Sequence, residues 1–348
     1  MTSLDRAHSR PASMTASVTA SMTPSIALAA ALTAAALTAF TPLAANAQTW
    51  PDKPVRMVIP FPPGGTLDKV GRMLAQRLQE QFGQTFVVEN KPGGNGVIGG
   101  DAVAKAAADG YTLLFNASTF VTAPMTMKSV PYKVQADFVP IALVAQAPLS
   151  IALSNTLGNK VGVTDLKSFV AAAKANPGKL NFATGSIGSA GHLCTARLEQ
   201  AAGIAVTVVP YKGTAPAFQD LIGGQIEGFI DPVLGSVQFH RTKQLHVVAV
   251  TSAKRLPNLP DVPTAAETLP GFTCASWYGL WAPAKTSADI VARLNAAVNK
   301  ALAADMADKL VADGLVPGGG SPADFAKFQA DDIAASGKII ADKKITID

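Results

Sequence analysis

After residue 54, the pattern of hydrophobic and polar positions changes from that of a strand to that of a helix. A run of β-forming residues at 55–59 ends in the stretch PFPPGG at 60–65, and apolar residues then recur at spacings of three and four to residue 82. This pattern predicts a strand, a tight loop and an amphipathic helix capped by Thr66 or Asp68. The loop would aim free N–H groups at a carboxylate or another oxyanion, although an ordinary βα unit without a ligand explains the pattern equally well.

The same order of strand, loop and helix continues along the chain. Alternation of this kind indicates an α/β fold with a largely parallel sheet, whose ligands bind beyond the carboxyl ends of the strands. Apolar runs at 141–145 and 150–153, separated by 146–148, predict two strands at a first crossing between domains. We therefore expect two α/β lobes, with residues 48–147 and 272–348 in lobe 1 and residues 148–271 in lobe 2. Helices are expected at 97–107, 289–304 and 322–333, among others.

The first 47 residues have the pattern of an export signal. Arg6 and Arg10 precede an Ala-rich apolar run at 26–40, and Ala45-Asn46-Ala47 forms a small-x-small cleavage motif. We expect cleavage between Ala47 and Gln48. The basic region is long, so the start of translation is left open among Met1, Met14 and Met22.

Charge and composition narrow the classes of function. The chain has 29 basic and 24 acidic residues, and no stretch clusters Lys or Arg with aromatic residues, so a nucleic-acid partner is not expected. The four histidines lack metal-binding spacing, and we expect no metal and no cofactor. Cys194 and Cys274 are the only cysteines. Export makes a disulfide possible, but two separate buried thiols are expected, because the two residues fall in different predicted lobes.

Two glycine-rich motifs partly match sequence motifs of enzymes. Residues 94–99 match G-x-G-x-x-G, but the next strand ends in Phe115-Asn116-Ala117 without the acid that holds a ribose, so a glycine-rich turn is preferred. Residues 185–192 suggest a nucleophile elbow, yet no serine there has glycine on both sides at the required spacing. A secreted hydrolase using Ser186 or Ser189 therefore remains only an alternative to a binding loop.

Four further polar residues follow predicted strands or begin helices. His192 starts a helix and is either a local packing residue or a cleft residue. The turn 210–214 contains Lys212, Gly213 and Thr214, with Thr214 as the expected N-cap and Lys212 either neutralising a carboxylate or solvated. Asp231 ends a strand, where it could repel an anion, accept from a ligand amine or hydroxyl, or cap the next turn.

Several segments carry a combined sequence pattern: the stretch WPDKPVR with PFPPGG and Asp68, VVENKPGGNGVIGGDAVAKAAADGYTLLF, residues 182–189, VPYKGTAPAFQDLIGGQIEGFID and AVTSAKRLPNLPDVPTAAE. Together these segments resemble the tripartite tricarboxylate transporter receptors, also called Bug proteins. The resemblance spans the chain after the leader. It implies a two-lobed, type II-like periplasmic binding protein that closes on a small organic carboxylate and delivers it to membrane permease subunits, without catalysis.

The resemblance also implies which residues hold the ligand. One clamp would comprise Phe61, Pro63, Gly65, Thr66 and Asp68, and the other Thr184, Gly185, Ser186, Gly188 and Ser189. Ser118 and Thr119 are expected near the far end of the ligand, in a loop that departs from the usual family sequence. The identity of the carboxylate stays open among di- and tricarboxylates, amino acids and aromatic carboxylates, and a ligand sensor for a signalling partner is a further alternative.

Overall fold

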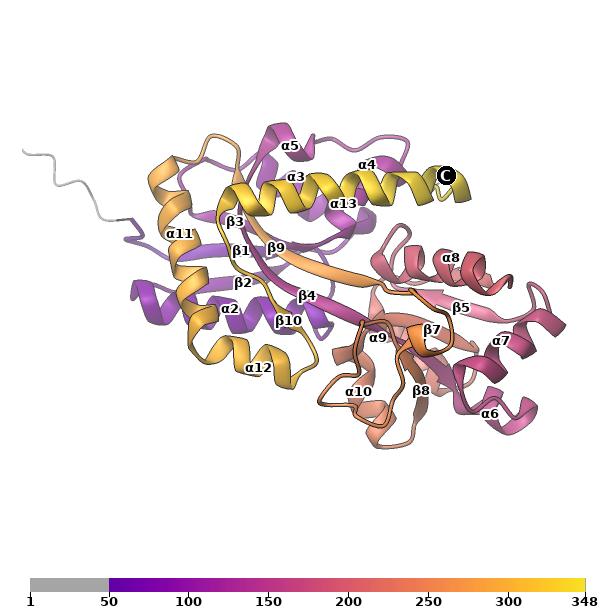
Figure 1. Cartoon of the computed structure of the whole chain (residues 1–348). Helices are drawn as coiled ribbons and strands as arrows, with labels where there is room; N and C mark the ends of the chain where they lie inside the picture. The colour runs from indigo at the N-terminus through magenta and orange to yellow at the C-terminus, as the bar shows by residue number, and fades with distance from the viewer. Residues whose placement is uncertain (1–49, 348) are drawn as a thin grey trace, which may run out of the picture. The chain divides into compact units, whose positions relative to one another are not determined.

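The computed structural model describes residues 50–347, and the predicted export signal lies outside them (Figure 1). Its strands alternate with helices as expected. The strands are β1 (Val55–Ile59), β2 (Phe86–Asn90), β3 (Thr112–Ala117), β4 (Phe138–Ser154), β5 (Asn181–Thr184), β6 (Thr207–Pro210), β7 (Gly228–Pro232), β8 (Leu245–Val250), β9 (Ala275–Pro283) and β10 (Val316–Pro317). The helices are α2 (Thr66–Phe82), α3 (Val97–Ala104), α4 (Thr119–Thr126), α5 (Val134–Asp137), α6 (Asn155–Val161), α7 (Leu166–Ala175), α8 (Ala190–Ala202), α9 (Thr214–Ile222), α10 (Val233–Arg241), α11 (Ala288–Ala301), α12 (Ala307–Ala312) and α13 (Pro322–Lys343).

One path of paired strands runs through both halves of the fold, in the order β2-β1-β3-β9-β4-β7-β5-β6. The pairs of β1 with β2 and β3, and of β5 with β6 and β7, are parallel, as the sequence predicts. The long strands β4 and β9 are antiparallel to each other and to their outer neighbours β7 and β3. Two parallel groups therefore flank a central antiparallel pair (Figure 1).

Strand β4 is a single 17-residue strand, so the prediction of two strands separated at 146–148 was wrong. Residues up to Pro148 pair with β9, and residues from Leu149 onward pair with β7 and β8. A proline cannot donate to a strand ladder. Here the missing N–H falls where the strand changes partners, which explains why Pro148 does not end the strand.

Each half of the sheet has a hydrophobic core on both faces. In the first half, Ile59 and Leu74 belong to the core beneath α2 and α11, while Val58 and Phe325 belong to the core beneath α3, α4 and α13 (Figure 1). In the second half, Ile151 packs with α7 and α8, and the neighbouring Ala152 packs with α9 and α10. Successive residues of a strand face opposite sides, so strands buried on both faces read as continuous apolar runs.

The helix that closes the chain is longer than predicted. Helix α13 runs to Lys343 rather than ending at residue 333. Its last turns bury Ile339 and Ile340 in a cluster with Leu193 of α8. The second part of the helix thus depends on contacts with a distant segment, which local periodicity does not report. Among residues 50–347, no helix is long and apolar enough to cross a membrane.

Cys194 and Cys274 form a disulfide, with their Cα atoms 5.9 Å apart. The expectation of two separate thiols was therefore wrong. Cys274 precedes β9 and belongs to the same core cluster as Cys194 of α8. The Cys274 N–H donates to the Thr251 carbonyl at 3.1 Å, and the Thr251 hydroxyl donates to the Cys274 carbonyl at 2.7 Å. These bonds hold the segment before β9 against the second half of the fold.

We expect the double substitution Cys194→Ala with Cys274→Ala to lower the free energy of unfolding by about 4 kcal/mol. The bridge closes a loop with a sequence separation of 80 residues, and its removal returns conformational entropy to the unfolded chain. Urea unfolding under non-reducing conditions measures the change. Wild-type protein under reducing conditions is the matched control and should lose a similar amount; equal stability of all three samples would contradict this account.

Candidate functional site

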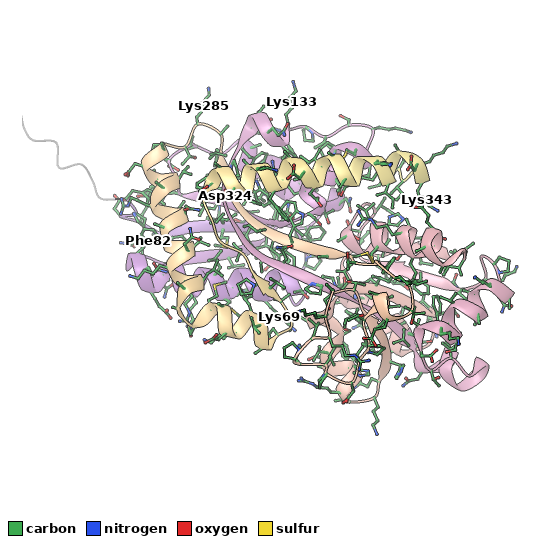
Figure 2. The ribbon with its side chains drawn as sticks, viewed as in Figure 1. Lys69, Phe82, Lys133, Lys285, Asp324 and Lys343 are labelled. Atoms are coloured by element: carbon green, nitrogen blue, oxygen red, sulfur yellow. A yellow bond between two sulfur atoms is a disulfide. The ribbon has the colours of Figure 1, made fainter. Side chains whose placement is uncertain are left out.

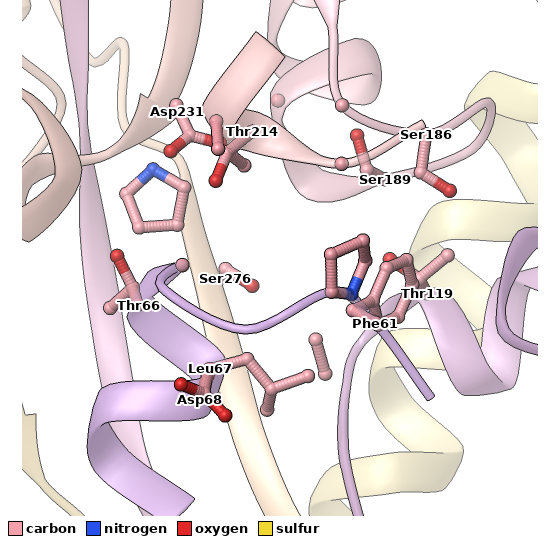
Figure 3. A pocket seen from close by; sticks show the side chains of 18 of the residues that line it. Phe61, Thr66, Leu67, Asp68, Thr119, Ser186, Ser189, Thr214, Asp231 and Ser276 are labelled. Carbon is pink, nitrogen blue, oxygen red and sulfur yellow. The ribbon is translucent and has the colours of Figure 1, made fainter. Parts of the chain in front are cut away.

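A cavity of about 100 Å³ lies where the carboxyl ends of β1, β3, β5 and β7 meet the first turns of α2, α8 and α9 (Figure 3). This is the edge at which α/β sheets bind ligands. Strand β9 adds a further wall, so both halves of the fold contribute. The lining residues are Phe61, Pro62, Pro63, Gly65, Thr66, Leu67, Asp68, Ala117, Thr119, Gly185, Ser186, Ser189, Ala190, Gly191, Gly213, Thr214, Ala215, Pro216, Asp231, Pro232, Ser276 and Tyr278.

Asp68 fixes the shape of the loop between β1 and α2. Its carboxylate accepts from the Gly64 N–H at 3.0 Å, from Arg72 Nε at 3.0 Å and from Asn90 Nδ2 at 2.9 Å. Asn90 Nδ2 also donates to the Phe61 carbonyl at 3.0 Å. Burial opposes ionisation, but the bonds from Arg72, Gly64 and Asn90 hold the pKa of Asp68 below its ordinary value. The hydrogen bonds that Asp68 accepts therefore position the loop between β1 and α2.

Glycines begin two of the three helices at the cavity. The N-cap of α2 is Gly65 and that of α9 is Gly213, so the expectation that Thr66 or Asp68 and Thr214 would be caps was wrong. Neither helix has a side-chain cap. Because the first N–H groups of a helix have no partner within it, these two first turns present unsatisfied donors at the cavity. Gly213 has φ 101°, a conformation that glycine adopts readily.

The loop after β5 is held by its own hydroxyl groups. The Thr184 hydroxyl donates to the Ser186 carbonyl at 2.7 Å and lies 3.1 Å from Ser189 Oγ. Ser189 is the N-cap of α8 and accepts from the backbone N–H of His192. The imidazole Nδ1 of His192 accepts from the Gly188 N–H at 3.2 Å, and burial lowers the pKa of His192 to about 4.

Two hydrogen bonds cross between the halves beside the cavity. The Thr122 hydroxyl of α4 donates to the Gly188 carbonyl at 2.8 Å, and Asn95 Nδ2 donates to the Ile187 carbonyl at 2.8 Å. Asn95 has φ 58° within the glycine-rich turn that precedes α3. The turn that resembled a dinucleotide motif therefore contacts the loop of the opposite half.

The structure brings most of the predicted site residues to one cavity. Those on its wall are Phe61, Pro63, Gly65, Thr66, Asp68, Thr119, Gly185, Ser186, Ser189, Gly213, Thr214 and Asp231. The others do not line it. Thr184, Gly188 and His192 are engaged in the hydrogen bonds of the β5 loop, Lys212 is exposed, and Ser118 lines a separate small cavity beside the disulfide.

Sequence reasoning missed the contribution of β9. Ser276 and Tyr278 line the cavity. The sequence cluster of Trp277, Tyr278 and Trp281 predicts core or hinge packing first, and an aromatic wall only second. That interpretation holds for Trp277 and Trp281, which pack in the core beneath α13. Alternation along a strand places Tyr278 on the opposite face from those two residues. The alternation was a usable signal, but it required the segment to be recognised as a strand.

Four buried polar atoms on the cavity wall have no hydrogen-bond partner within residues 50–347. They are Thr66 Oγ1, Ser186 Oγ, Asp231 Oδ2 and Tyr278 Oη. A buried polar group without a partner costs free energy, so native proteins rarely retain several in one place. Their grouping around one cavity makes that cavity the candidate site for a polar ligand.

Cations play little part in the walls of this cavity. Among the described residues, no Lys or Arg side chain lines it, and labelled lysines such as Lys133, Lys285 and Lys343 are exposed and project outward (Figure 2). Burial raises the pKa of Asp231 well above its ordinary value. Burial, and then the charge that Asp231 carries when ionised, raise the pKa of the Tyr278 hydroxyl. The positive potential at the cavity therefore comes from helix N-termini.

The arrangement does not form a catalytic serine site. The His192 imidazole accepts a backbone N–H rather than a serine hydroxyl, and Ser189 Oγ is used as a helix cap. Within residues 50–347, no cluster of His, Cys, Asp or Glu could hold a metal ion. Two α/β halves that share two strands and enclose a small cavity of unsatisfied donors define the class of solute-binding proteins.

Comparisons with known proteins agree with this class. Residues 70–345 match the model of the tripartite tricarboxylate transporter family receptor. Protein BugT of Bordetella pertussis is 38% identical over 303 residues, covering 85% of this chain and 91% of BugT. The structure of R. palustris Rpa4515 with adipate superposes with a TM-score of 0.81 at 35% identity, covering 85% of this chain and 99% of that one. MatC (Rpa3494) from Rhodopseudomonas palustris with bound malate gives 0.76 at 31% identity, covering 84% and 100%.

The chain belongs to the family of tripartite tricarboxylate transporter receptors. The resemblance stated from the sequence motifs is thereby confirmed, as is the two-lobed α/β fold of periplasmic binding proteins. This is a family of solute-binding receptors and not of enzymes, so the alternative of a secreted hydrolase using Ser186 or Ser189 is rejected.

We expect Asp68→Asn to lower the free energy of unfolding by about 2 kcal/mol at neutral pH, because a buried carboxylate that accepts three hydrogen bonds is lost. The folded pKa of Asp68 is depressed, so its contribution is complete above the ordinary value of 3.8 and disappears as the pH falls through the folded pKa. Urea unfolding of both proteins at a series of pH values measures this.

The matched control for Asp68→Asn is Asp331→Asn. Asp331 pairs with Lys327 on the exposed face of α13, where an ion pair contributes little. Equal effects of the two substitutions at neutral pH, or a wild-type advantage that grows as the pH falls, would contradict the positioning role of Asp68.

Proposed function

We propose that this protein is a periplasmic receptor that captures a small organic carboxylate in the cavity and delivers it to membrane permease subunits of a tripartite transporter. The observation that carries the proposal is the set of buried polar atoms without partners on the cavity wall. Membership of the receptor family supports the same function.

The proposed ligand contacts start from the uncapped first turns of α2 and α9. Free N–H groups at helix N-termini bind carboxylates without a cationic side chain. The buried Ser186 hydroxyl, which has no hydrogen-bond partner among residues 50–347, would donate to the ligand, as would the buried Thr66 hydroxyl on the other side of the cavity (Figure 3). Asp68, with the loop that it positions, would act on the ligand indirectly, as would Thr184 and Gly188 through the loop after β5.

The size of the cavity favours a small ligand. Two structural neighbours at 35% and 31% identity contain adipate and malate, which are both short aliphatic dicarboxylates. A cavity of about 100 Å³ is consistent with a small ligand of this class.

Delivery to a permease requires a change that the partner can sense. The predicted lobes, residues 48–147 with 272–348 and residues 148–271, would separate about the shared strands β4 and β9. Opening would break the Thr122–Gly188 and Asn95–Ile187 hydrogen bonds beside the cavity. Closure around a ligand would restore them and present one surface to the membrane subunits.

We expect Ser186→Ala to weaken carboxylate binding by about 5- to 30-fold, since one hydrogen bond to a charged group is lost. Isothermal titration with adipate, malate and a panel of other carboxylates measures the affinity, and ligand-dependent thermal stabilisation provides a second reading. Ser129→Ala is the matched control, because Ser129 is exposed and away from the cavity wall. A wild-type protein that binds no carboxylate, or a Ser186→Ala protein with unchanged affinity, would contradict the proposed site.

The expected export signal leads to a separate prediction. The protein recovered from the periplasmic fraction should begin at Gln48, because Ala45-Asn46-Ala47 has the form of a signal cleavage motif. Amino-terminal sequencing of that fraction measures the start. Substitution of Ala47 by a bulky residue should leave uncleaved precursor, whereas recovery of the full-length chain from the wild-type periplasm would refute the assignment.

A further inference from the structure

The disulfide between Cys194 and Cys274 lies within a few residues of the cavity wall along both of the segments that it joins. Cys194 belongs to α8, whose N-cap Ser189 is on that wall. Cys274 lies two residues before Ser276 of β9, which is also on the wall (Figure 3). A covalent bond between these segments therefore limits how far two parts of the cavity wall can move apart.

The bridge also adjoins the two strands that both halves of the fold share. Ala275 of β9 pairs with Pro148 of β4, and a proline offers no N–H to that ladder. The segment before β9 is held to the second half by Thr251 instead. Its hydroxyl donates to the Cys274 carbonyl at 2.7 Å and accepts from the Leu149 N–H at 2.8 Å. The bridge thus begins at the point about which the two halves would separate.

Helix α8 has few other directed links to this segment. In the part of the chain that the structure describes, the hydrogen bonds of α8 run to residues between Gly188 and Val206. Both cysteines belong to one apolar cluster, but apolar contact is non-directional. A cavity of about 50 Å³ lies beside the bridge, with Ser118 and Arg197 on its wall. Close packing fixes positions in a core, so this cavity leaves the two segments room to move if the bridge is absent.

The first turn of α8 packs directly against β7. A Cβ atom on Gly191 would lie 2.1 Å from the Ile230 carbonyl oxygen, so no side chain separates the two backbones. Asp231, the next residue of β7, is on the cavity wall. Helix α8 therefore contacts β7 through its backbone and β9 through the bridge, and a shift of α8 alters the cavity at both strands.

We propose that the Cys194–Cys274 disulfide is a positioning element of the ligand site, which holds the first turn of α8 and the start of β9 in the arrangement that binds a ligand. The inference rests on the proposed function and gives the bridge a role beyond the stability of the fold. Without the bridge, the two segments adopt further arrangements, so a ligand must order them when it binds and its affinity falls.

We expect the double variant Cys194→Ala with Cys274→Ala to bind adipate and malate about 5- to 20-fold more weakly than the oxidised wild type. Isothermal titration at a temperature where circular dichroism shows every protein to be folded measures the affinity. Reduced wild type should bind as weakly as the double variant, and reoxidation should restore its affinity. The double variant should show the same affinity with and without reductant.

The matched control for lost stability is Leu294→Ala. Leu294 of α11 is fully buried in the core of the first half and lines neither cavity. Its truncation should remove a comparable amount of stability, since a buried leucine leaves a cavity behind, but it should change the affinity by less than about twofold. An equal loss of affinity in Leu294→Ala would attribute the effect to stability alone and overturn the positioning role.

Thermodynamic linkage supplies a second measurement. Reduction by dithiothreitol transfers two electrons and two protons to the bridge and yields two thiols and the cyclic disulfide of the reagent. If the bridge tightens binding by a given factor, saturating adipate or malate must shift this equilibrium towards the bridge by the same factor. Alkylation and counting of thiols after an acid quench, with and without the carboxylate, measure the shift in the folded protein. No shift would contradict the proposal.

Hydrogen exchange tests the positioning without a ligand. We expect the backbone N–H groups of residues 192–196 and 274–278 to exchange faster in the double variant than in Leu294→Ala. Equal exchange in the two proteins, or unchanged affinity in the double variant, would overturn the role of the bridge and leave the receptor function intact. Failure of the oxidised wild type to bind adipate, malate and every other carboxylate of the panel would overturn the proposed function, and the effect of the bridge on affinity with it.

Discussion

The antiparallel pairing of β4 with β9 is the constraint on which the rest of the structure depends. These two strands are the middle of the sheet path, and β4 changes partners from β9 to β7 and β8 at Pro148 and Leu149. Because backbone groups buried on both faces must be paired, the two parallel groups of strands have to meet at this pair. Their carboxyl ends then face each other, and the cavity forms between them.

The proposed recognition of charge in the cavity relies on the backbone more than on side chains. Glycine N-caps leave the first turns of α2 and α9 without a side-chain partner, and no Lys or Arg among the described residues lines the wall. A helix terminus holds an anion in a fixed direction without a long flexible side chain, so the site is organised before a ligand arrives. Asp68 supports that organisation by binding Gly64 in the loop.

Much of the fold could be predicted, because each βα unit carries its own local pattern. The first strand, loop and helix at 55–82 appear as β1, the PFPPGG loop and α2, and the parallel pairing of β1 with β2 and β3 follows from their alternation with helices. The predictions were wrong where contacts between segments far apart in the sequence determine the structure. Pro148 does not interrupt β4, Cys274 packs against α8, and Ile339 extends α13 through contact with Leu193.

The sequence by itself determined the order of elements, the family and the candidate ligand-binding loops, because turn residues and periodicity are local properties. Only the tertiary structure decided which of those loops share a cavity and how their polar groups are employed. In the folded protein, Asp68 accepts a hydrogen bond from Gly64 in the loop and His192 accepts one from Gly188. Tyr278 of β9 joins the cavity wall, and Asp231 Oδ2 has no hydrogen-bond partner within residues 50–347. Burial and hydrogen-bond satisfaction depend on segments far apart in the chain, and no local pattern contains them.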